Sequence, residues 1–304
     1  MAKSAGTNGL DIQRDYLCVA QFSSRDGAVR QVAVQPLPAG AEGDGFWDAV
    51  AQELRGLKKK IRFAGADVVC SLPCDMAVVK TLEAESDERG QDEILRWELE
   101  ASLLGQIDNY VYDFYEVDPG NQVERRKYLA AAVRHEALAK LKKAVRGAGL
   151  NPYIVDIDLF ALTGTFQSNY RERLSEASVL VHGEPKRTKM ILVCNSSYIN
   201  YAVADFDTEA SGAADYATML RDETARLLDA GGFSGGDGAP VYMAGSLFTD
   251  LQFAADVTNA FPRSEMLDPF RKVACDAGIE EEQLKVYSPQ LAVAVGLALR
   301  GDEV

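Results

Sequence analysis

The chain has 304 residues, of which 47% are hydrophobic and 26% are charged, enough to bury a sizeable core and most simply to form two domains. Its 46 acidic residues outnumber its 32 basic ones and give a net charge of -14, which argues against nucleic-acid binding because the exterior repels phosphate. The five cysteines are irregularly spaced and predict a reducing compartment, and with only two histidines no metal site is expected. The N-terminus lacks the apolar stretch of a signal peptide, so we expect a cytoplasmic protein unless a partner recruits it.

The first half of the chain alternates short strands with amphipathic helices. Apolar runs predict strands over residues 10–22, 29–36, 67–72, 76–82, 110–117, 128–133 and 153–158. Helical periodicity predicts helices over residues 45–60, 92–105, 135–146 and 159–170. Pro73 interrupts the extended segment between 67 and 82, and the interruption predicts a hairpin.

The second half repeats this pattern in broad form. Strands are predicted over residues 179–182, 190–194, 198–205 and 241–244. Helices are predicted over residues 216–228, 247–261 and 289–300, with a glycine-rich linker over 231–238. Two halves that each open with antiparallel strands and close with helices predict an α/β fold with a duplicated core.

The first strand carries Leu10-Asp11-Ile12-Gln13-Arg14, which resembles a damaged phosphate-binding loop. In actin-like ATPases this strand ends in Asp-x-Gly-x-Ser/Thr, because phosphates need close backbone N–H groups and a carboxylate that orients magnesium. Here Asp11 keeps the carboxylate, but Gln13 replaces the glycine and Arg14 would fill the space of a phosphate. Arg14 is either a solvent-facing turn residue or a guanidinium that holds phosphate without turnover.

Several stretches, in a consistent order and spacing, resemble the family of the type IV pilus assembly protein PilM, a relative of the cell-division protein FtsA. These stretches are Gly9-Leu10-Asp11-Ile12, Gln35-Pro36-Leu37-Pro38-Ala39-Gly40, Val69-Cys70-Ser71-Leu72-Pro73, Leu95-Arg96-Trp97-Glu98-Leu99-Glu100, Ala148-Gly149-Leu150-Asn151-Pro152, Val155-Asp156-Ile157-Asp158 and Ala292-Val293-Ala294-Val295-Gly296-Leu297-Ala298-Leu299-Arg300. Their shared order is hard to obtain by chance.

The resemblance implies an actin-like (FtsA/PilM-type) α/β fold. This fold has a duplicated ribonuclease-H-like core, an inserted α/β subdomain and, here, a reduced second small subdomain. The implied boundaries are 1–65 with 153–176 for the first core subdomain, 66–152 for the insertion and 177–304 for the second core subdomain. The lid that would close over a nucleotide is shortened to about 206–238.

The resemblance also implies partners and a location. PilM-like proteins bind the short cytoplasmic N-terminal peptide of a bitopic inner-membrane protein, PilN, in a groove between the first core subdomain and the insertion. Other pilus platform or motor components are expected as partners, and a homo-oligomer or ring stays open. The protein is then cytoplasmic and peripheral to the inner membrane through its partner. We expect the peptide to contact Leu72, Val78, Leu95 and Leu99.

The nucleotide motifs of the family are degenerate in this chain. In the second phosphate loop the aspartate is replaced by Val181, and Glu184 followed by Pro185 sets negative charge near the phosphates. Gly183 in that loop and Gly245 in the adenosine-side motif are remnants, and with Asp11 and Arg14 they define a vestigial nucleotide site. We therefore expect no catalytic residues and no cofactor, with ATP and magnesium as the alternative.

The leading interpretation is a non-catalytic scaffold, a pseudo-ATPase, in the inner-membrane platform of a type IV pilus machine. One alternative is a nucleotide-binding actin-like ATPase of that machine. Another is the cytoplasmic actin-like component of type II secretion, whose members usually continue into a transmembrane helix, whereas this sequence ends at Val304.

Two surfaces allow more than one interpretation. Helical spacing predicts that Trp97 is buried, while Leu95, Leu99 and Leu103 form a second apolar stripe that would line the peptide groove. The basic residues between 125 and 146 predict either a solvated helix face or a surface that faces acidic partners or anionic lipids.

Overall fold

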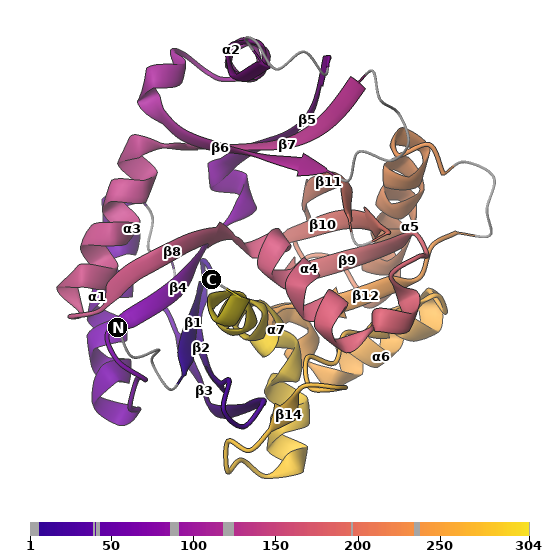
Figure 1. Cartoon of the computed structure of the whole chain (residues 1–304). Coiled ribbons are helices and arrows are strands. Elements are labelled where there is room, and N and C mark those ends of the chain that lie inside the picture. The colour runs from indigo at the N-terminus through magenta and orange to yellow at the C-terminus, as the bar shows by residue number, and fades with distance from the viewer. Residues whose placement is uncertain are drawn as a thin grey trace.

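The structure, a computed structural model, describes residues 6–38, 40, 43–85, 91–117, 125–195, 197–233 and 238–303. Within these residues the strands form three sheets, and helices lie against the sheets and between them (Figure 1). Two of the sheets belong to the halves of the duplicated core. The third, at the top of Figure 1, is a separate sheet, although its residue Val79 packs in an apolar cluster with residues of the core.

The first core sheet has the strand order β14-β3-β2-β1-β4-β8. Its strands are β1 (Thr7–Ile12), β2 (Tyr16–Ser23), β3 (Ala28–Pro36), β4 (Asp67–Leu72), β8 (Asn151–Ile157) and β14 (Ala274–Cys275). The first three are antiparallel neighbours, and β4 and β8 continue the sheet in parallel. Helices α1 (Gly43–Lys60) and α3 (His135–Gly147) cover one face, where Leu54 and Leu141 are fully buried in a common apolar cluster.

The second core sheet has the order β11-β10-β9-β12-β13. Its strands are β9 (Ser178–Glu184), β10 (Arg187–Cys194), β11 (Ser197–Asp205), β12 (Val241–Ala244) and β13 (Ser264–Met266). Again three antiparallel strands lie beside parallel ones, as a duplicated core requires. Helices α5 (Ala213–Ala230) and α6 (Leu251–Ala260), with the 3-10 turn η4 (Ser246–Thr249), pack on this sheet.

Two helices, α4 (Asp158–Asn169) and α7 (Glu281–Glu303), join the halves. Helix α7 approaches both β1 and α4 so closely that only glycine fits at two contacts. A side chain at Gly9 would collide with the backbone of Ala294, and one at Gly296 would collide with the backbone of Ala161. The tight fit buries Leu291, Ala292, Val293 and Leu297 among residues of both halves.

The third sheet has the order β5-β7-β6 and is antiparallel throughout. It consists of β5 (Ala77–Glu85), β6 (Tyr110–Val117) and β7 (Arg125–Arg134), and helix α2 (Gln91–Glu100) covers one face of it at the top of Figure 1. Short 3-10 turns η1 (Cys74–Met76), η2 (Ile107–Asn109) and η3 (Arg171–Arg173) complete the described elements.

Several predicted elements differ from the structure. The hairpin predicted around Pro73 is wrong, because β4 pairs with β1 and β8 while β5 pairs with β7 in another sheet. The predicted insertion, residues 66–152, therefore includes β4 and α3, which pack in the first core, and the separate sheet spans only residues 77–134. The helix predicted over 247–261 divides into η4 and α6, and the terminal helix begins eight residues earlier, at Glu281 rather than 289. Within the predicted linker, residues 234–237 lie outside the described part of the chain.

The described residues contain neither a membrane-spanning helix nor a cluster of metal ligands. No helix there combines the length and the apolar character that crossing a bilayer requires. No group of three or more His, Cys, Asp or Glu side chains in the same residues is arranged to hold a metal ion.

Candidate functional site

The β1–β2 turn directs consecutive side chains to different environments. The turn is closed by a hydrogen bond from the Gln13 backbone N–H to the Tyr16 carbonyl, at 3.0 Å. Gln13 is fully buried, whereas the Arg14 side chain is 47% exposed. Asp11, also fully buried, accepts hydrogen bonds from Gln13 Nε2 at 2.8 Å and from Ser71 Oγ at 2.7 Å. The residue that replaces the family's glycine thus fixes the retained aspartate.

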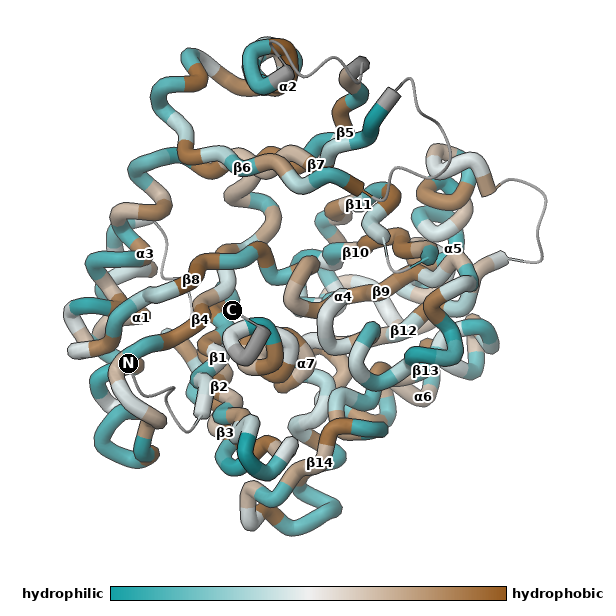
Figure 2. Tube along the Cα trace, viewed as in Figure 1, coloured by the Kyte–Doolittle hydropathy of each residue, from teal (hydrophilic) through white to brown (hydrophobic). Residues whose placement is uncertain are grey.

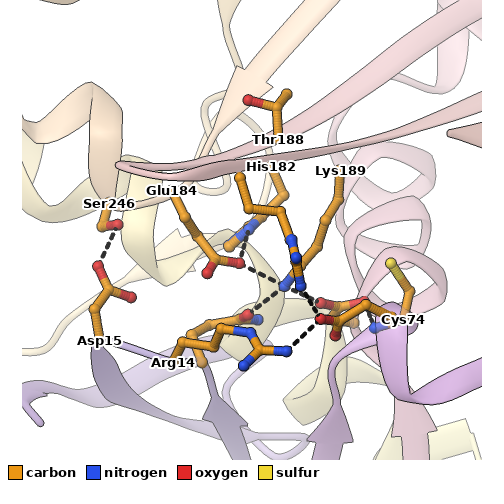
Figure 3. A network of polar contacts seen from close by, with 12 residues as sticks. Arg14, Asp15, Cys74, His182, Glu184, Thr188, Lys189 and Ser246 are labelled. Carbon is orange, nitrogen blue, oxygen red and sulfur yellow. Dashed lines mark hydrogen bonds and ion pairs between the residues drawn. The ribbon is translucent and has the colours of Figure 1, made fainter. Parts of the chain in front are cut away.

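A buried lysine stands at the centre of this region (Figure 3). Lys189, from β10, is completely inaccessible to solvent and donates to Gln13 Oε1 at 2.7 Å. Its ammonium also lies 2.9 Å from Asp158 Oδ2, at the start of α4, and 2.5 Å from Glu184 Oε1, at the end of β9. Asp158 is held in turn by the backbone N–H groups of Cys74 and Leu159. One cation therefore joins three chain segments that converge from both halves of the core.

Ionisation in this cluster follows from burial and from the neighbouring charge. Burial disfavours the Glu184 carboxylate, but the Lys189 ammonium and His182 outweigh that effect and lower the pKa of Glu184 to about 2. The two carboxylates in turn outweigh the burial of Lys189 and raise the pKa of its ammonium. Asp11 has no cation in contact, and burial raises its pKa to about 6 in spite of the nearby His182 and the hydrogen bond from Ser71. The cluster is a buried ion-pair network beside a weakly acidic aspartate whose Oδ2 has no hydrogen-bond partner among the described residues.

Tyr16, His182, Asp15 and Ser246 add polar contacts between the two halves of the core. Tyr16 Oη and His182 Nε2 are 2.9 Å apart, and His182 Nδ1 lies 3.7 Å from Glu184 Oε1. Ser246 donates to Asp15 Oδ2 at 2.8 Å, which ties the β1–β2 turn to η4 in the other half (Figure 3). These contacts give both halves polar partners across the junction.

The two retained glycines serve close packing. A Cβ at Gly183 would lie 2.7 Å from Phe248 and 2.9 Å from the Tyr216 hydroxyl. Gly245 has a φ of 106°, a region that favours glycine, and a side chain there would collide with the backbone of Gly183. The remnants of the second phosphate loop and of the adenosine-side motif thus pack on each other, and Phe248 covers them.

The predicted vestigial residues therefore lie in one region but in two environments. Asp11, Gly183 and Gly245 are at the closed junction, whereas Arg14 forms an ion pair with Asp75, with Arg14 Nη2 at 2.5 Å from the carboxylate. Asp75 also contacts Arg187 of β10. At the junction, polar side chains already bond the Lys189 ammonium, and aromatic rings cover the glycines. The network therefore holds the converging chain segments together.

Arg14 also borders an open groove of about 230 Å³ between the first core and the third sheet. The residues that line it come from the β1–β2 turn, the first half of α1, η1, the end of β7 and the first half of α3: Arg14, Gly43, Phe46, Trp47, Met76, Arg134, Glu136, Ala137 and Lys140. Phe46 and Trp47 are almost fully buried and form its apolar floor. Arg134 and Lys140 place cations at the rim.

The residues predicted to contact a peptide lie elsewhere. Leu72, Leu95 and Leu99 are at most 2% exposed, and Leu72 packs in the first core while Leu95 and Leu99 pack under the third sheet. Val78 is half-buried and borders a different hollow, between β5 and β11. The prediction that Trp97 is buried is wrong, because its side chain is 71% exposed. Helix α2 has two apolar stripes, and the sheet covers the one that carries Leu95 and Leu99.

Sequence reasoning missed Lys189, Asp158 and the groove. A signal for Lys189 was present: it directly precedes the apolar run Met190-Ile191-Leu192-Val193, and a lysine within a buried strand needs carboxylate partners. Asp158 is the last residue of the stretch Val155-Asp156-Ile157-Asp158, which carried the resemblance but assigned that residue no role. The groove had no local signal, since its lining comes from four separate segments.

Comparisons with known proteins agree with this fold. Residues 9–182, more than half of the 304, match the family described as type IV pilus assembly protein PilM. A solved PilM-PilN type IV pilus biogenesis complex contains a chain 24% identical, with a TM-score of 0.79 over 97% of this chain and 98% of that one. No curated protein matches the chain.

More distant structures share the actin-like core. The cytoplasmic domain of EpsL, an inner-membrane component of the type II secretion system of Vibrio cholerae, is 11% identical, with a TM-score of 0.50 over 79% of this chain and 82% of that one. The ethanolamine utilization protein EutJ from Carboxydothermus hydrogenoformans is also 11% identical, with a TM-score of 0.50 over 97% and 89%. The predicted actin-like fold is confirmed, and the family match shows that the chain belongs to the type IV pilus assembly protein PilM family.

Proposed function

We propose that this protein is a non-catalytic scaffold of a type IV pilus assembly platform, and that it holds the cytoplasmic N-terminal peptide of a PilN-like inner-membrane protein. The observation that carries the proposal is the groove bordered by Arg14, Phe46, Trp47, Arg134 and Lys140. A structural relative with a TM-score of 0.79 is part of a PilM-PilN complex, which supports a partner of this kind. Attachment to the inner membrane would then pass through that partner.

The chemistry of the groove suits a short peptide with apolar side chains. Phe46 and Trp47 make an edge-on pair with ring centroids 4.9 Å apart, a rigid apolar floor for one or two inserted side chains. The starts of α1 and α3 face the same space, and unpaired backbone N–H groups at helix N-termini attract carbonyl or carboxylate oxygens. Arg14 and Arg134 add donors that orient the peptide backbone. We propose this groove in place of the site predicted around Leu95 and Leu99, because those two side chains are buried.

The closed junction supports the non-catalytic part of the proposal. ATP turnover needs N–H groups open to phosphate and a carboxylate that orients metal-bound water. In this chain Lys189 bonds both Gln13 and Glu184 where the two phosphate-loop segments meet, and Gly183 is covered by Phe248. A nucleotide would have to break a buried ion-pair network before it could bind.

The peptide proposal is tested by blocking the groove without disturbing the core. Ala137 lines the groove and is half-buried, so Ala137→Arg should fill it and weaken binding of a synthetic N-terminal peptide of the PilN-like protein at least tenfold in fluorescence anisotropy. Ala139 is exposed on the same helix and does not line the groove, so Ala139→Arg is the matched control with the same added charge. Equal affinities for the two variants, both folded by circular dichroism, would place the peptide elsewhere.

The non-catalytic proposal is tested by calorimetry and thermal shift with ATP and magnesium. We expect no binding heat and no stabilisation at millimolar ATP, because a ligand that binds only the folded state must raise its melting temperature. An authentic actin-like ATPase run in parallel is the positive control. Binding at low micromolar concentration would support the ATPase alternative.

A further inference from the structure

An unusual concentration of unpaired cations lies where α1 and α3 end. The side chains are contributed by the last turn of α1, by the residue two positions beyond it, and by the second half of α3: Lys59, Lys60, Arg62, Lys142, Lys143 and Arg146. Among the described residues, none of these six cations forms an ion pair with a carboxylate. We call this the basic surface. It is notable in a chain whose net charge is -14.

Hydrogen bonds fix the two helix ends against each other. Lys58 Nζ donates to the carbonyls of Gly149 at 2.6 Å and Ala148 at 3.2 Å, and Arg55 Nη1 donates to the Gly147 carbonyl at 3.4 Å. Lys58 and Arg55 thus have a structural role, because they provide hydrogen-bond donors for carbonyl groups at the C-terminal end of α3. Among the described residues, none of the six cations of the basic surface bonds these carbonyl groups, and Lys60 Nζ donates instead to Gln35 Oε1 at 3.0 Å. They are held on a rigid base, with α1 and α3 side by side on the left of Figure 1.

The basic residues predicted between 125 and 146 separate into different roles. Arg126 pairs with Glu116, Lys127 with Glu83, and Lys140 with both Asp44 and Glu136. Arg134 lies over the ring of Tyr110. Among the described side chains of this stretch, Lys142, Lys143 and Arg146 form no ion pair with a carboxylate, and they lie at the same end of the molecule as the cations of α1. In Figure 2 the hydrophilic colour recurs along both helices.

We propose that the basic surface binds the anionic lipid headgroups of a membrane. Cations near an anionic bilayer attract it over about a Debye length, roughly 8 Å at physiological salt, so acidic residues on distant faces oppose the contact only weakly. This proposal rests on the proposed function, in which a membrane-protein peptide bound in the groove brings the protein to a membrane. The groove lies at the opposite ends of the same two helices.

The composition of the surface favours lipid over an acidic protein. Protein interfaces concentrate their affinity in buried aromatic and apolar anchors. The hollow beside the basic surface, about 570 Å³, is lined by Gln52, Glu53, Arg55, Gly56, Lys58, Lys59 and Ala148, with no aromatic residue. Dispersed charge without an apolar anchor suits a fluid layer of headgroups.

The test uses the purified full chain and vesicles, without any peptide. Sedimentation with mixed phosphatidylglycerol and phosphatidylcholine vesicles should show binding that pure phosphatidylcholine vesicles lack and that salt weakens. Replacing Lys59, Lys143 and Arg146 with Gln should reduce the partition coefficient by roughly a hundredfold, because each cation contributes roughly fivefold near an anionic surface. Their exposure predicts that the fold survives.

The matched control removes the same charge elsewhere. Arg25, Arg171 and Lys272 are exposed cations on other elements, and their triple Gln variant should keep nearly all vesicle binding. Equal losses in the two triple variants would overturn the proposal, since net charge would then suffice. Failure of the native chain to bind anionic vesicles would also overturn it, and binding to soluble polyglutamate in that case would indicate an acidic protein partner. Peptide affinity should be unchanged in the first variant, so a failure of the groove proposal is measured separately.

Discussion

The β1–β2 turn separates a closed polar network from an open groove, and the two regions use similar side chains in opposite ways. At the junction, Gln13 and Lys189 are fully buried and bonded to one another. One residue along, Arg14 contacts Asp75 at the edge of the groove and stays about half exposed. Burial makes each polar group of the network essential, because an unpaired charge there cannot be solvated. Exposure leaves the groove free to exchange water for a ligand.

The largest expected effect is the loss of the central cation. Lys189→Met should lower the free energy of unfolding by about 3–5 kcal/mol, because it leaves two buried carboxylates without their partner. Urea denaturation of both proteins at neutral pH measures the difference. Adding Glu184→Gln to the variant should recover part of the loss, since one uncompensated charge is removed with it.

A neighbouring cation on the same strand provides the control for that change. Arg187 is 27% exposed and contacts Asp75 and Asp205, so Arg187→Met should cost no more than about 1 kcal/mol. If both substitutions lowered the free energy of unfolding equally, burial would not explain the difference proposed between the closed network and the residues beside the groove.

An intermediate effect is expected at Asp11, where it depends on pH. The pKa of Asp11 rises from 3.8 in the unfolded chain to about 6 in the folded state, so between these values the folded state holds a proton that the unfolded state has lost. Stability contributed by this group therefore falls as the pH rises through that window and is constant above it. Glu184, with a pKa lowered to about 2, acts in the opposite direction and at lower pH.

Asp11→Asn should remove the dependence that Asp11 causes. The variant should match the native protein near pH 4, where Asp11 is protonated when folded, and should be more stable by about 1–3 kcal/mol near pH 8. Denaturation curves at the two pH values measure both differences. A loss of stability near pH 8 would mean that the carboxylate charge contributes favourably and would reopen a role for it in binding.

The smallest expected effect on stability is at Arg14. Arg14→Gln should change the free energy of unfolding by less than about 1 kcal/mol, because the pair with Asp75 is partly solvated and Arg187 remains. It should nevertheless weaken peptide binding, measured by anisotropy, since Arg14 borders the groove. If Arg14→Gln bound the peptide with native affinity, the peptide would contact the part of the groove lined by Trp47 and not the part lined by Arg14.

The fold was predictable where local pattern and final environment agree. The periodicity of α1 placed Phe46, Val50, Leu54 and Leu57 on one face, and all four are buried. Strand pairing was less accessible, because β4 and β5 follow each other in sequence but bond to partners far along the chain. On α2, both stripes were apolar, and only tertiary packing decides that Leu99 is covered while Trp97 is exposed.

The candidate site was predictable in position and unpredictable in content. Degenerate motifs singled out Asp11, Gly183 and Gly245. In the structure the two glycines pack on each other, and Asp11 lies in the buried polar cluster near His182. The Lys189 ammonium, which occupies this region, comes from a strand in which the five residues after it are buried and apolar. Its carboxylate partners are supplied by β9 and α4. Such an arrangement depends on three segments meeting, which no local pattern encodes. The groove required the same convergence.

Helix α7 has a consequence for the order of folding. Its residues 291–298 belong to apolar clusters that also contain Leu162 of α4 and Cys18 of β2. Position 9 in the first strand lies so close to the backbone of α7 that only glycine fits there. Neither half of the molecule can finish its core until this late segment is available. When most of the chain has emerged from the ribosome, the first sheet still lacks its contacts with α7. Because these native contacts have high sequence separation, they form late, and we expect refolding to be slow.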